Sequence, residues 1–301
     1  MRLPGVSEHV IVRRFDKRLY GALFLMATSA IGPGFITQTT QFTAQLGAAF
    51  AFAILVSIFI DVALQLNVWR VIGVSGCRAQ ELGNSVAPGL GHVFAFFVVL
   101  GGFVFNVGNV AGAGLGLEAL LGLDPQWGGA VSALLAIAVF LSRRAGVAMD
   151  RIVVVLGFVM IALTAYVAFV SQPPIGTALR NAVLPERVDF LAITTLVGGT
   201  VGGYITYAGA HRLLDAGVRG PARVAEISRA SVIGVLVTGL MRVLLFLAVL
   251  GVVAAGVRLE PSNPAASAFE AAAGEVGRRM FGLILWAAAI TSVIGASYTS
   301  V

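Results

Sequence analysis

Residues 198–207, Gly-Gly-Thr-Val-Gly-Gly-Tyr-Ile-Thr-Tyr, interrupt a long apolar stretch with two glycine pairs and several hydroxyl groups. A helix would lose about 1 kcal/mol per glycine relative to alanine at this point. Backbone polar groups cannot stay unpaired in lipid, so irregular backbone at that depth must face protein or a water-filled cavity. A second candidate break, Gly32-Pro33-Gly34, precedes the polar run Thr37-Gln38-Thr39-Thr40-Gln41. Because secondary transporters hold their substrates at interrupted membrane helices, the two breaks together predict a transporter.

The composition predicts an all-α polytopic membrane protein. Hydrophobic residues make up 58% of the chain, charged residues 11%, and the mean hydropathy is +0.95. A soluble domain carries about a quarter charged residues. Apolar stretches long enough for a hydrocarbon core of roughly 30 Å recur along the whole chain. We predict eight spans, at residues 19–48 (broken), 50–69, 91–121, 127–141, 152–171, 190–210 (broken), 230–256 and 280–301.

The basic residues predict an orientation in the membrane. Most arginines and lysines fall in alternate loops, which the positive-inside rule places in the cytoplasm together with residues 1–18. We therefore expect an integral protein of a bacterial inner (plasma) membrane with a cytoplasmic N-terminus. This placement explains the net charge of +6, so nucleic acid is not expected as a partner. The expected partners are the lipid bilayer, a small-molecule substrate and a co-transported proton or ion.

Specific resemblances accompany the two breaks. Residues 31–35, Ile-Gly-Pro-Gly-Phe, followed by Leu46-Gly47-Ala48, resemble the opening of the NRAMP divalent-metal transporters, and Gly199-Thr200-Val201 is similar to that family's Gly-Ala-Thr-Val segment. The resemblance implies the leucine-transporter-type inverted-repeat fold, with the first and sixth spans unwound around the substrate. It also implies a first five-helix repeat over 19–171, an outer loop over 172–189 and a partial second repeat of three helices over 190–301. The chain would then be truncated after its eighth span.

The expected metal ligands are absent from the matching positions. The family uses an Asp-Pro-Gly-Asn stretch in the first span and a Met-Pro-His stretch in the sixth. Aligning on residues 46–48 puts Ile36-Thr37-Gln38-Thr39 at the first stretch, and aligning on residues 199–201 puts Gly202-Gly203-Tyr204 at the second. Transition metals prefer carboxylate, imidazole or sulfur donors, which neither stretch supplies. The sequence therefore predicts no metal site and no cofactor.

The residues at the breaks favour a small organic acid or an amino-acid-like solute. Half-helices that begin at a break expose unpaired N–H groups and partial positive charge, which suit a carboxylate. The candidate substrate-binding residues are Thr37, Gln38, Thr39, Thr40, Gln41, Gly202, Gly203, Tyr204 and Thr206.

The Thr-Gln run also resembles an NRAMP-related bacterial branch associated with 5-oxoproline metabolism, which implies a cyclic amino acid as a candidate. The alternative is a divalent metal cation (Mn, Fe or Mg), as in the parent family. Mg²⁺ is included because it can be held through its waters by hydroxyl and amide groups.

Two charged residues fall within predicted spans. Asp61 and Arg242 are each flanked by apolar residues, and either charge costs about 2.5–3.5 kcal/mol at a helix centre by insertion scales. The functional interpretation makes Asp61 a proton acceptor and Arg242 its partner or a contact for a substrate anion. The structural alternatives are a static ion pair, or an Arg242 that extends toward the membrane interface.

Glycines in the third predicted span indicate close helix packing. Gly108, Gly112 and Gly116 have the four-residue spacing of small residues at helix contacts. The glycines of the stretch quoted first share this spacing, so packing is the alternative to a break there. Asn106 and Asn109 lie beside the first set, and we expect them to bridge helices rather than contact substrate.

Other classes of membrane protein fit less well. No Ser-His, paired-Asp or His-rich motif at membrane depth indicates an enzyme. A channel stays a competing hypothesis, because glycine-rich breaks also form selectivity filters, and saturable, gradient-coupled uptake would separate the two. Trp69 and Trp127 fall at predicted span ends, as interfacial anchors do.

Overall fold

A computed structural model describes residues 17–142 and 145–300 of the chain. Those residues form helices joined by turns, without a strand in either described range. This confirms the predicted all-α class. Most of the predicted cytoplasmic segment, residues 1–16, lies outside the described residues.

Helices occupy all eight stretches that the sequence predicts as spans. Each of the two predicted broken spans consists of two helices. In chain order these helices are α1 (Lys17–Ala30), α2 (Pro33–Leu46), α3 (Phe50–Ser75), α5 (Leu90–Leu121), α6 (Pro125–Leu141), α7 (Ala145–Val170), α9 (Phe190–Val201), α10 (Ile205–Asp215), α11 (Val224–Ala254) and α12 (Pro264–Ser300). Two short helices, α4 (Ala79–Val86) and α8 (Ile175–Val183), and two 3₁₀ turns, η1 (Gly47–Ala49) and η2 (Pro221–Arg223), complete the described elements.

Two stretches differ from the prediction. Helix α8 lies inside residues 172–189, which the sequence indicated as a loop. Helix α12 begins at Pro264 rather than near residue 280, and it is kinked at Ala273 and Gly274, where the φ of Gly274 is 65°. Both added helical segments carry polar and charged residues, so a search for long apolar stretches passes over them.

Length and apolarity allow a membrane crossing for much of the described chain. Five helical stretches are long and apolar enough, or six if the bent pair of α7 and α8 counts as one. Helix α6, with 17 residues, and residues 21–30 of α1 are shorter. The count of eight spans stays a prediction.

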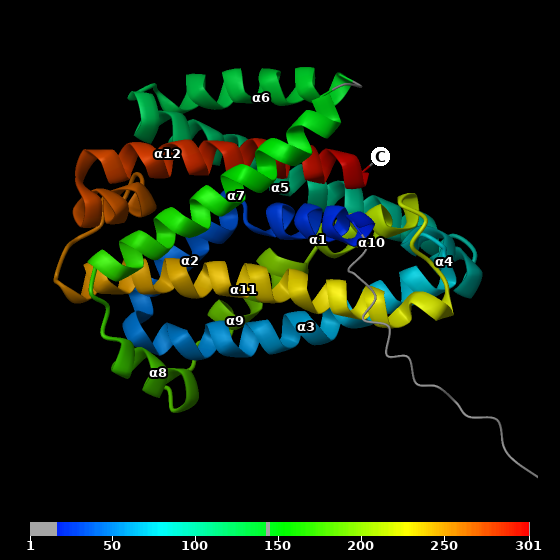
Figure 1. Ribbon diagram of the computed structural model, residues 1–301, viewed down its shortest axis with the longest axis horizontal. Coiled ribbons are helices and arrows are strands. Elements are labelled where there is room, and N and C mark those ends of the chain that lie inside the picture. The colour runs from blue at the N-terminus through cyan, green and yellow to red at the C-terminus, as the bar shows by residue number, and fades with distance from the viewer. Residues whose placement is uncertain (1–16, 143–144, 301) are drawn as a thin grey trace, which may run out of the picture.

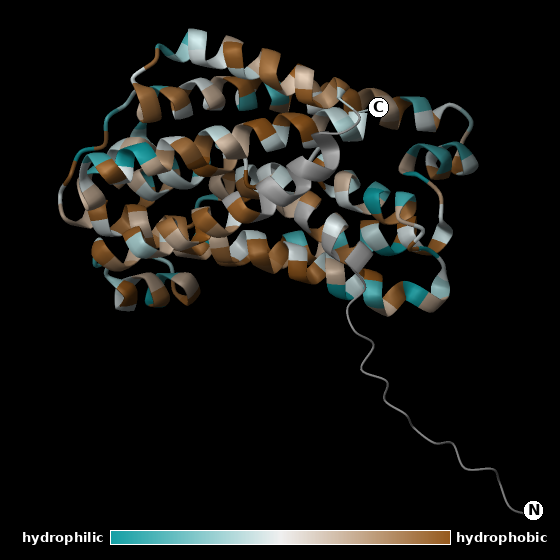
Figure 2. Cartoon of the chain, turned by 45° about the horizontal axis from the view of Figure 1, so that its top comes forward, coloured by the Kyte–Doolittle hydropathy of each residue, from teal (hydrophilic) through white to brown (hydrophobic). Residues whose placement is uncertain are grey.

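The long helices share one axis. In Figure 1, α3, α11 and α12 run along the long axis of the molecule, and α7 crosses them obliquely. Helix α8 and the α11–α12 connection lie at one end, and α4 lies at the other. Figure 2 shows apolar residues along the lengths of the helices and hydrophilic residues gathered toward the two ends. Large apolar side chains such as Phe59, Phe103 and Phe169 are exposed on the outer surface, as a lipid-facing surface requires.

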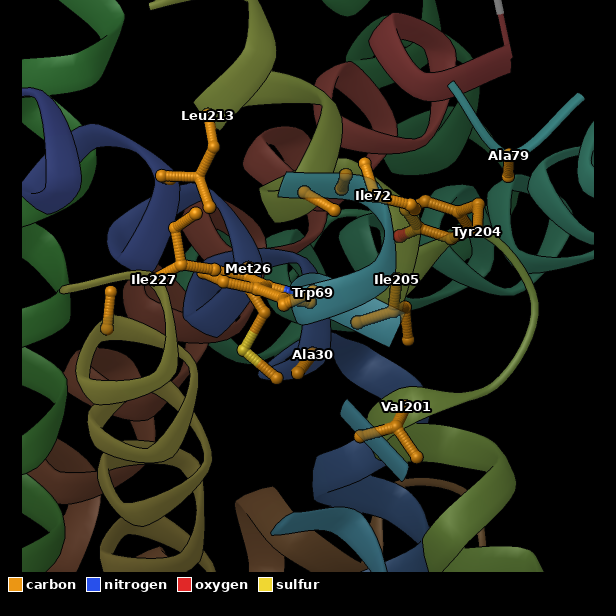
Figure 3. Packing of buried hydrophobic residues seen from close by; sticks show 14 of the residues in the cluster. Met26, Ala30, Trp69, Ile72, Ala79, Val201, Tyr204, Ile205, Leu213 and Ile227 are labelled. Carbon is orange, nitrogen blue, oxygen red and sulfur yellow. The ribbon is translucent and has the colours of Figure 1, made fainter. Parts of the chain in front are cut away.

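One buried cluster connects α1, α3 and α10, and Trp69 is at its centre (Figure 3). The Trp69 side chain has no exposed surface, and its indole N–H donates to the carbonyl oxygen of Thr206 at 3.0 Å. A Cβ on Gly209 would lie 2.2 Å from Trp69, so the glycine makes room for the ring. The prediction that Trp69 is an interfacial anchor is therefore wrong, whereas Trp127 is exposed.

Two of the three spaced glycines of α5, Gly112 and Gly116, pack against other helices as predicted. A Cβ on Gly112 would lie 2.1 Å from Pro33, at the start of α2. A Cβ on Gly116 would lie 2.6 Å from the backbone nitrogen of Trp286 on α12. Gly108 has no atom of a neighbouring helix within 4 Å of such a Cβ. Helix α5 therefore touches the first broken span where that span is interrupted.

Candidate functional site

The first break consists of Ile31 and Gly32, between α1 and α2. Gly32 has extended backbone angles (φ −99°, ψ −178°), and Pro33 occupies the first turn of α2. Proline suits that position because its missing N–H would be unpaired there anyway. The conformation therefore follows from the local sequence, as predicted.

The second break consists of Gly202, Gly203 and Tyr204, between α9 and α10. Gly202 is extended, and Gly203 has a φ of 56°, in the left-handed region that favours glycine. The hydroxyl of Thr206 donates to the carbonyl oxygen of Val201 at 2.7 Å, which satisfies an acceptor at the end of α9. The interruption of the sixth span is confirmed, and close packing alone does not account for its glycines.

The two breaks lie close together. Ala30, which ends α1, belongs to the same buried cluster as Val201 and Tyr204 (Figure 3). The helices next to the breaks also touch. The side chain of Gln38 on α2 lies against Gly199 on α9, since a Cβ on Gly199 would be 2.6 Å from Oε1 of Gln38. This apposition is what a substrate site between two interrupted helices requires.

Residues from two further helices face the first break. A Cβ on Gly32 would lie 2.9 Å from the hydroxyl of Ser292 on α12 and 3.2 Å from Oδ1 of Asn109 on α5. Ser292 donates to the carbonyl oxygen of Thr28 at 3.1 Å, near the end of α1. Asn109 and Ser292 are both buried. Sequence reasoning missed Ser292 and placed Asn109 between helices, because only the fold brings both residues to Gly32.

Asn106 acts as predicted. Its amide nitrogen donates to the hydroxyl of Ser297 on α12 at 3.3 Å, and its amide oxygen accepts from Asn109 at 3.3 Å. Asn106 thus bridges α5 and α12, and it orients the residue that faces the break.

The predicted Thr-Gln run lies on α2 rather than in the interrupted backbone. The hydroxyl of Thr39 donates to the carbonyl oxygen of Phe35 at 2.8 Å, within the helix. Thr40 is buried, and its hydroxyl has no hydrogen-bond partner among the described residues. Thr37 and Gln41 line a cavity of about 110 Å³ that reaches from Pro33 to the α11–α12 connection. The run is therefore divided: Thr37 and Gln41 point to this cavity, whereas Gln38 points to α9.

The position of the break corrects the register of the alignment made from the sequence. The residues aligned with the family's Asp-Pro-Gly-Asn stretch, 36–39, are helical, and the break comes four residues earlier, at Gly32. The residues at the break itself are Gly32-Pro33-Gly34-Phe35. These also lack a carboxylate and a side-chain amide, so the argument from missing metal ligands holds in the corrected register.

Tyr204, the last residue of the second break, points into the protein interior. Its ring is fully buried and contacts Phe105 edge-on, with 5.4 Å between the ring centroids. Its hydroxyl lies near the Asn109 side chain, without a hydrogen bond of good geometry within the described parts of the chain. A buried hydroxyl left unpaired is costly, which makes Tyr204 a candidate donor to a ligand.

Asp61 and Arg242 lie within electrostatic range of each other. Each side chain is 1% exposed, and the attraction between the two charges is one of the main electrostatic contacts of both. The guanidinium carbon of Arg242 lies 4.3 Å from the centroid of the Phe35 ring. Oδ1 of Asp61 and both Nε and Nη2 of Arg242 lack a hydrogen-bond partner in the described residues. The two buried charges therefore attract each other without a direct hydrogen bond or close ion pair between them.

A second polar cluster closes the α4 end of the molecule. The carboxylate of Asp215, the last residue of α10, accepts from Arg78 at 3.2 Å and from the hydroxyl of Tyr298 on α12. One turn earlier on α10, His211 is buried, and its ring stacks on Tyr207 with centroids 5.9 Å apart. Nothing in the sequence around His211 indicates this burial.

No metal centre is evident in the described part of the chain. Three or more His, Cys, Asp or Glu side chains do not gather there in an arrangement that could hold an ion. The polar groups near the two breaks are hydroxyls, amides and backbone groups, with Asp61 and Arg242 beyond them on α3 and α11.

The apolar helices and the two apposed breaks define a membrane transporter fold. The chain belongs to the Nramp (natural resistance-associated macrophage protein-like) family, whose model matches residues 23–300. It is therefore an integral membrane protein of a family of transporters.

Relatives and solved structures agree with this assignment. The chain is 59% identical over 283 residues to the "Uncharacterized membrane protein YcsG" of Bacillus subtilis, covering 94% of this chain and 70% of the relative. It is 56% identical over 281 residues to an "Uncharacterized membrane protein" of Haemophilus influenzae, covering 93% of this chain and 71% of that protein.

A mutant of the Eremococcus coleocola manganese transporter matches with a TM-score of 0.72 at 18% identity, over 100% of this chain and 67% of that one. The same transporter in complex with an aromatic bis-isothiourea substituted compound matches with a TM-score of 0.68 at 17% identity, over 94% and 64%. At these identities the structural likeness concerns the fold, and it confirms the predicted leucine-transporter type.

Proposed function

We propose that this chain forms the substrate-binding part of a secondary transporter that alternates access by rocking one helix bundle against another. The observation that carries the proposal is the apposition of the two breaks, because broken helices in such folds hold the substrate near the membrane midplane. The repeat division at residues 172–189 and a cytoplasmic N-terminus in a bacterial inner membrane belong to the same proposal.

Two substrate classes follow from different observations. The comparisons favour a divalent metal cation more than an organic solute, because the family is Nramp and the matched structures are of a manganese transporter. The donor atoms at the breaks favour the other class. Gly32, Phe35 and Gly202 supply no carboxylate, imidazole or thioether, and the buried Arg242 guanidinium beside Phe35 would repel a cation.

A small organic acid suits the site chemistry best. Helices α2 and α10 both begin at the breaks, and helix N-termini carry partial positive charge and unpaired N–H groups. Asn109, Ser292 and Tyr204 add neutral polar groups, and the glycines allow close approach to the backbone. We therefore propose a small organic acid or amino-acid-like solute as the substrate, with the divalent cation as the second candidate.

Ligand-dependent thermal unfolding of the full-length protein in detergent tests the choice. The ligands to compare are 5-oxoproline, proline, Mn²⁺ and Mg²⁺. A ligand at 100 times its Kd adds about 2.7 kcal/mol to the free energy of unfolding, which is readily detected. Stabilisation by 5-oxoproline or proline but not by Mn²⁺ supports the organic substrate. Stabilisation by micromolar Mn²⁺ alone would overturn it in favour of the cation.

A further inference from the structure

We propose that Arg242 binds the carboxylate of the transported acid and that Asp61 takes up one proton each time it does so. Substrate and proton would then cross together in a one-to-one ratio. This inference rests on the proposed function, because it names how an anionic substrate is recognised and coupled.

A ring of neighbouring residues, linked by contacts and by one charge attraction, connects the two charged residues to the breaks. Phe35 on α2 touches Arg242 on α11, and Arg242 attracts Asp61 on α3. The hydroxyl of Thr200 on α9 lies beside Asp61, and its neighbour Gly199 touches Gln38, one turn along α2 from Phe35. Phe35 follows the first break by three residues, and Thr200 precedes the second by two. Phe35 and Thr200 therefore connect the two charged residues to the two breaks.

The polar groups of this ring are incompletely paired. Oδ1 of Asp61, Oε1 of Gln38 and two nitrogens of Arg242 have no hydrogen-bond partner among the described residues. Thr200 does not donate a hydrogen bond to Asp61, because its single O–H donates to the carbonyl oxygen of Leu196 at 2.8 Å. Buried charges are normally paired and hydrogen-bonded, so donors left open next to a break indicate that a ligand completes them.

The charge balance then links substrate to proton. In the empty site, the guanidinium of Arg242 and the carboxylate of Asp61 neutralise each other. A bound carboxylate would leave one excess negative charge in a buried, low-dielectric region, which is strongly unfavourable. Transfer of one proton from water to Asp61 restores neutrality. The bound complex is then a carboxylate–guanidinium pair beside a neutral Asp61.

Arg242 is the charged group that faces Asp61 from the neighbouring elements. Helices α2 and α9 and the turn η1, which pack around α3 or next to it, contain no ionisable side chain. Helices α8, α10 and α11 and the turn η2, which also pack against α3, carry further ionisable groups. These are Arg180 on α8, Tyr207, His211, Arg212 and Asp215 on α10, Arg223 on η2, and Glu226 and Arg229 on α11. The pH response of binding is therefore expected to come from Asp61.

Calorimetric titration of the full-length protein with 5-oxoproline and proline tests the coupling, with Mn²⁺ as a separate arm. Repeating the titration in buffers of different ionisation enthalpy counts the protons taken up. We expect up to one proton per bound acid at pH values where Asp61 is ionised in the empty protein and neutral in the complex, and a Kd that rises about tenfold per pH unit there. The substrate carboxyl, with an ordinary pKa of about 3.5, is itself ionised at these pH values.

Three variants separate the roles of the two residues. Asp61→Asn should bind the acid without proton uptake and without the pH slope. Arg242→Gln should weaken binding about 100-fold, as loss of one partner of a buried charge pair does. Because Arg242→Gln leaves Asp61 buried and unpaired, the double variant Asp61→Asn/Arg242→Gln supplies a neutral background in which binding should also be lost. Arg279→Gln, on an exposed side chain of α12, is the control and should change neither quantity.

The outcomes distinguish the two proposals. Binding of an acid without proton uptake, or an unchanged pH slope in Asp61→Asn, would overturn the coupling while leaving the organic substrate in place. Acid binding that survives Arg242→Gln would overturn the carboxylate contact. Binding of Mn²⁺ with no binding of either acid would overturn the proposed substrate class, and the coupling with it.

Discussion

Arg242 lies over the face of the Phe35 ring, with its guanidinium carbon 4.3 Å from the ring centroid, and both side chains are buried. Phe35 is on the first turn of α2, just after the first break. This cation–π contact holds a charged group of α11 beside the interrupted backbone of the first span. Arg242 is predicted from its charge to be important, whereas Phe35 resembles an ordinary residue of the hydrophobic core, and the contact joins the two.

Phe35→Leu should destabilise the protein through loss of this contact. A desolvated cation–π interaction contributes about 2 kcal/mol, and leucine keeps most of the apolar volume. The test is a double-mutant cycle on thermal unfolding in detergent with Phe35→Leu, Arg242→Gln and the double variant. We expect a coupling free energy of about 1–2 kcal/mol. Equal costs of Phe35→Leu in both backgrounds would show that the ring does not stabilise the guanidinium.

The breaks were predictable from the sequence because their signals are local. Glycine favours the positive φ that Gly203 adopts, and proline favours the start of a helix, where Pro33 lies. The conformational preference of each residue therefore predicts its break. The register of the metal-site alignment is wrong because its anchor, Leu46-Gly47-Ala48, lies at the end of α2, whereas the break precedes that helix. An anchor at one end of a helix locates residues at the other end only if the number of residues between them is known to be the same.

The rest of the site depends on tertiary contacts. Ser292 lies far along the chain from Gly32, and nothing in the sequence around it indicates that α12 brings it to the break. The same holds for the approach of Asp61 to Arg242. The prediction of an interfacial Trp69 is wrong because a place near a predicted span end does not indicate whether the side chain points to lipid or to another helix. Local patterns predict elements and interruptions, whereas helix packing determines which side chains share a site.

Gly203→Ala should disturb the second break through backbone conformation. With a φ of 56°, an alanine there costs about 1–2 kcal/mol, whereas the nearest atom to its Cβ would be Cε2 of Phe105 at an ordinary 3.6 Å. We expect a lower unfolding temperature and a weaker stabilisation by the bound substrate. Gly203→Asn should be milder, because asparagine tolerates the left-handed region better.

Gly198→Ala is the matched control for that variant. Gly198 lies within α9, and a Cβ there would meet no atom of a neighbouring element within 4 Å. Alanine is favoured over glycine in a helix by up to about 1 kcal/mol, so this variant should be neutral or stabilising. If both variants cost the same, the positive φ of Gly203 is not the reason for its effect.

Gly209→Ala should destabilise the packing of α10 against α3. Its Cβ would lie 2.2 Å from Cζ2 of Trp69 and 3.0 Å from Cβ of Met26, so the indole would have to move and its hydrogen bond to Thr206 would be strained. Overpacking of this kind costs about 1–3 kcal/mol, measurable as a lower unfolding temperature. Adding Trp69→Phe to Gly209→Ala should recover part of the loss. If it worsens the loss instead, the clash is not with the indole.

Asp215→Asn should loosen the α4 end of the molecule, because Asp215 joins Arg78 to Tyr298 there. Cys77, the one cysteine of the sequence, is the neighbour of Arg78 and serves as a native probe. A partly exposed ion pair contributes about 0.2–1 kcal/mol, so labelling of Cys77 by a maleimide should accelerate by up to about fivefold. Glu275→Gln breaks the exposed pair with Arg279 on the first half of α12 and should leave the labelling rate unchanged. Equal acceleration in both variants would mean that the Asp215 contacts do not close this end.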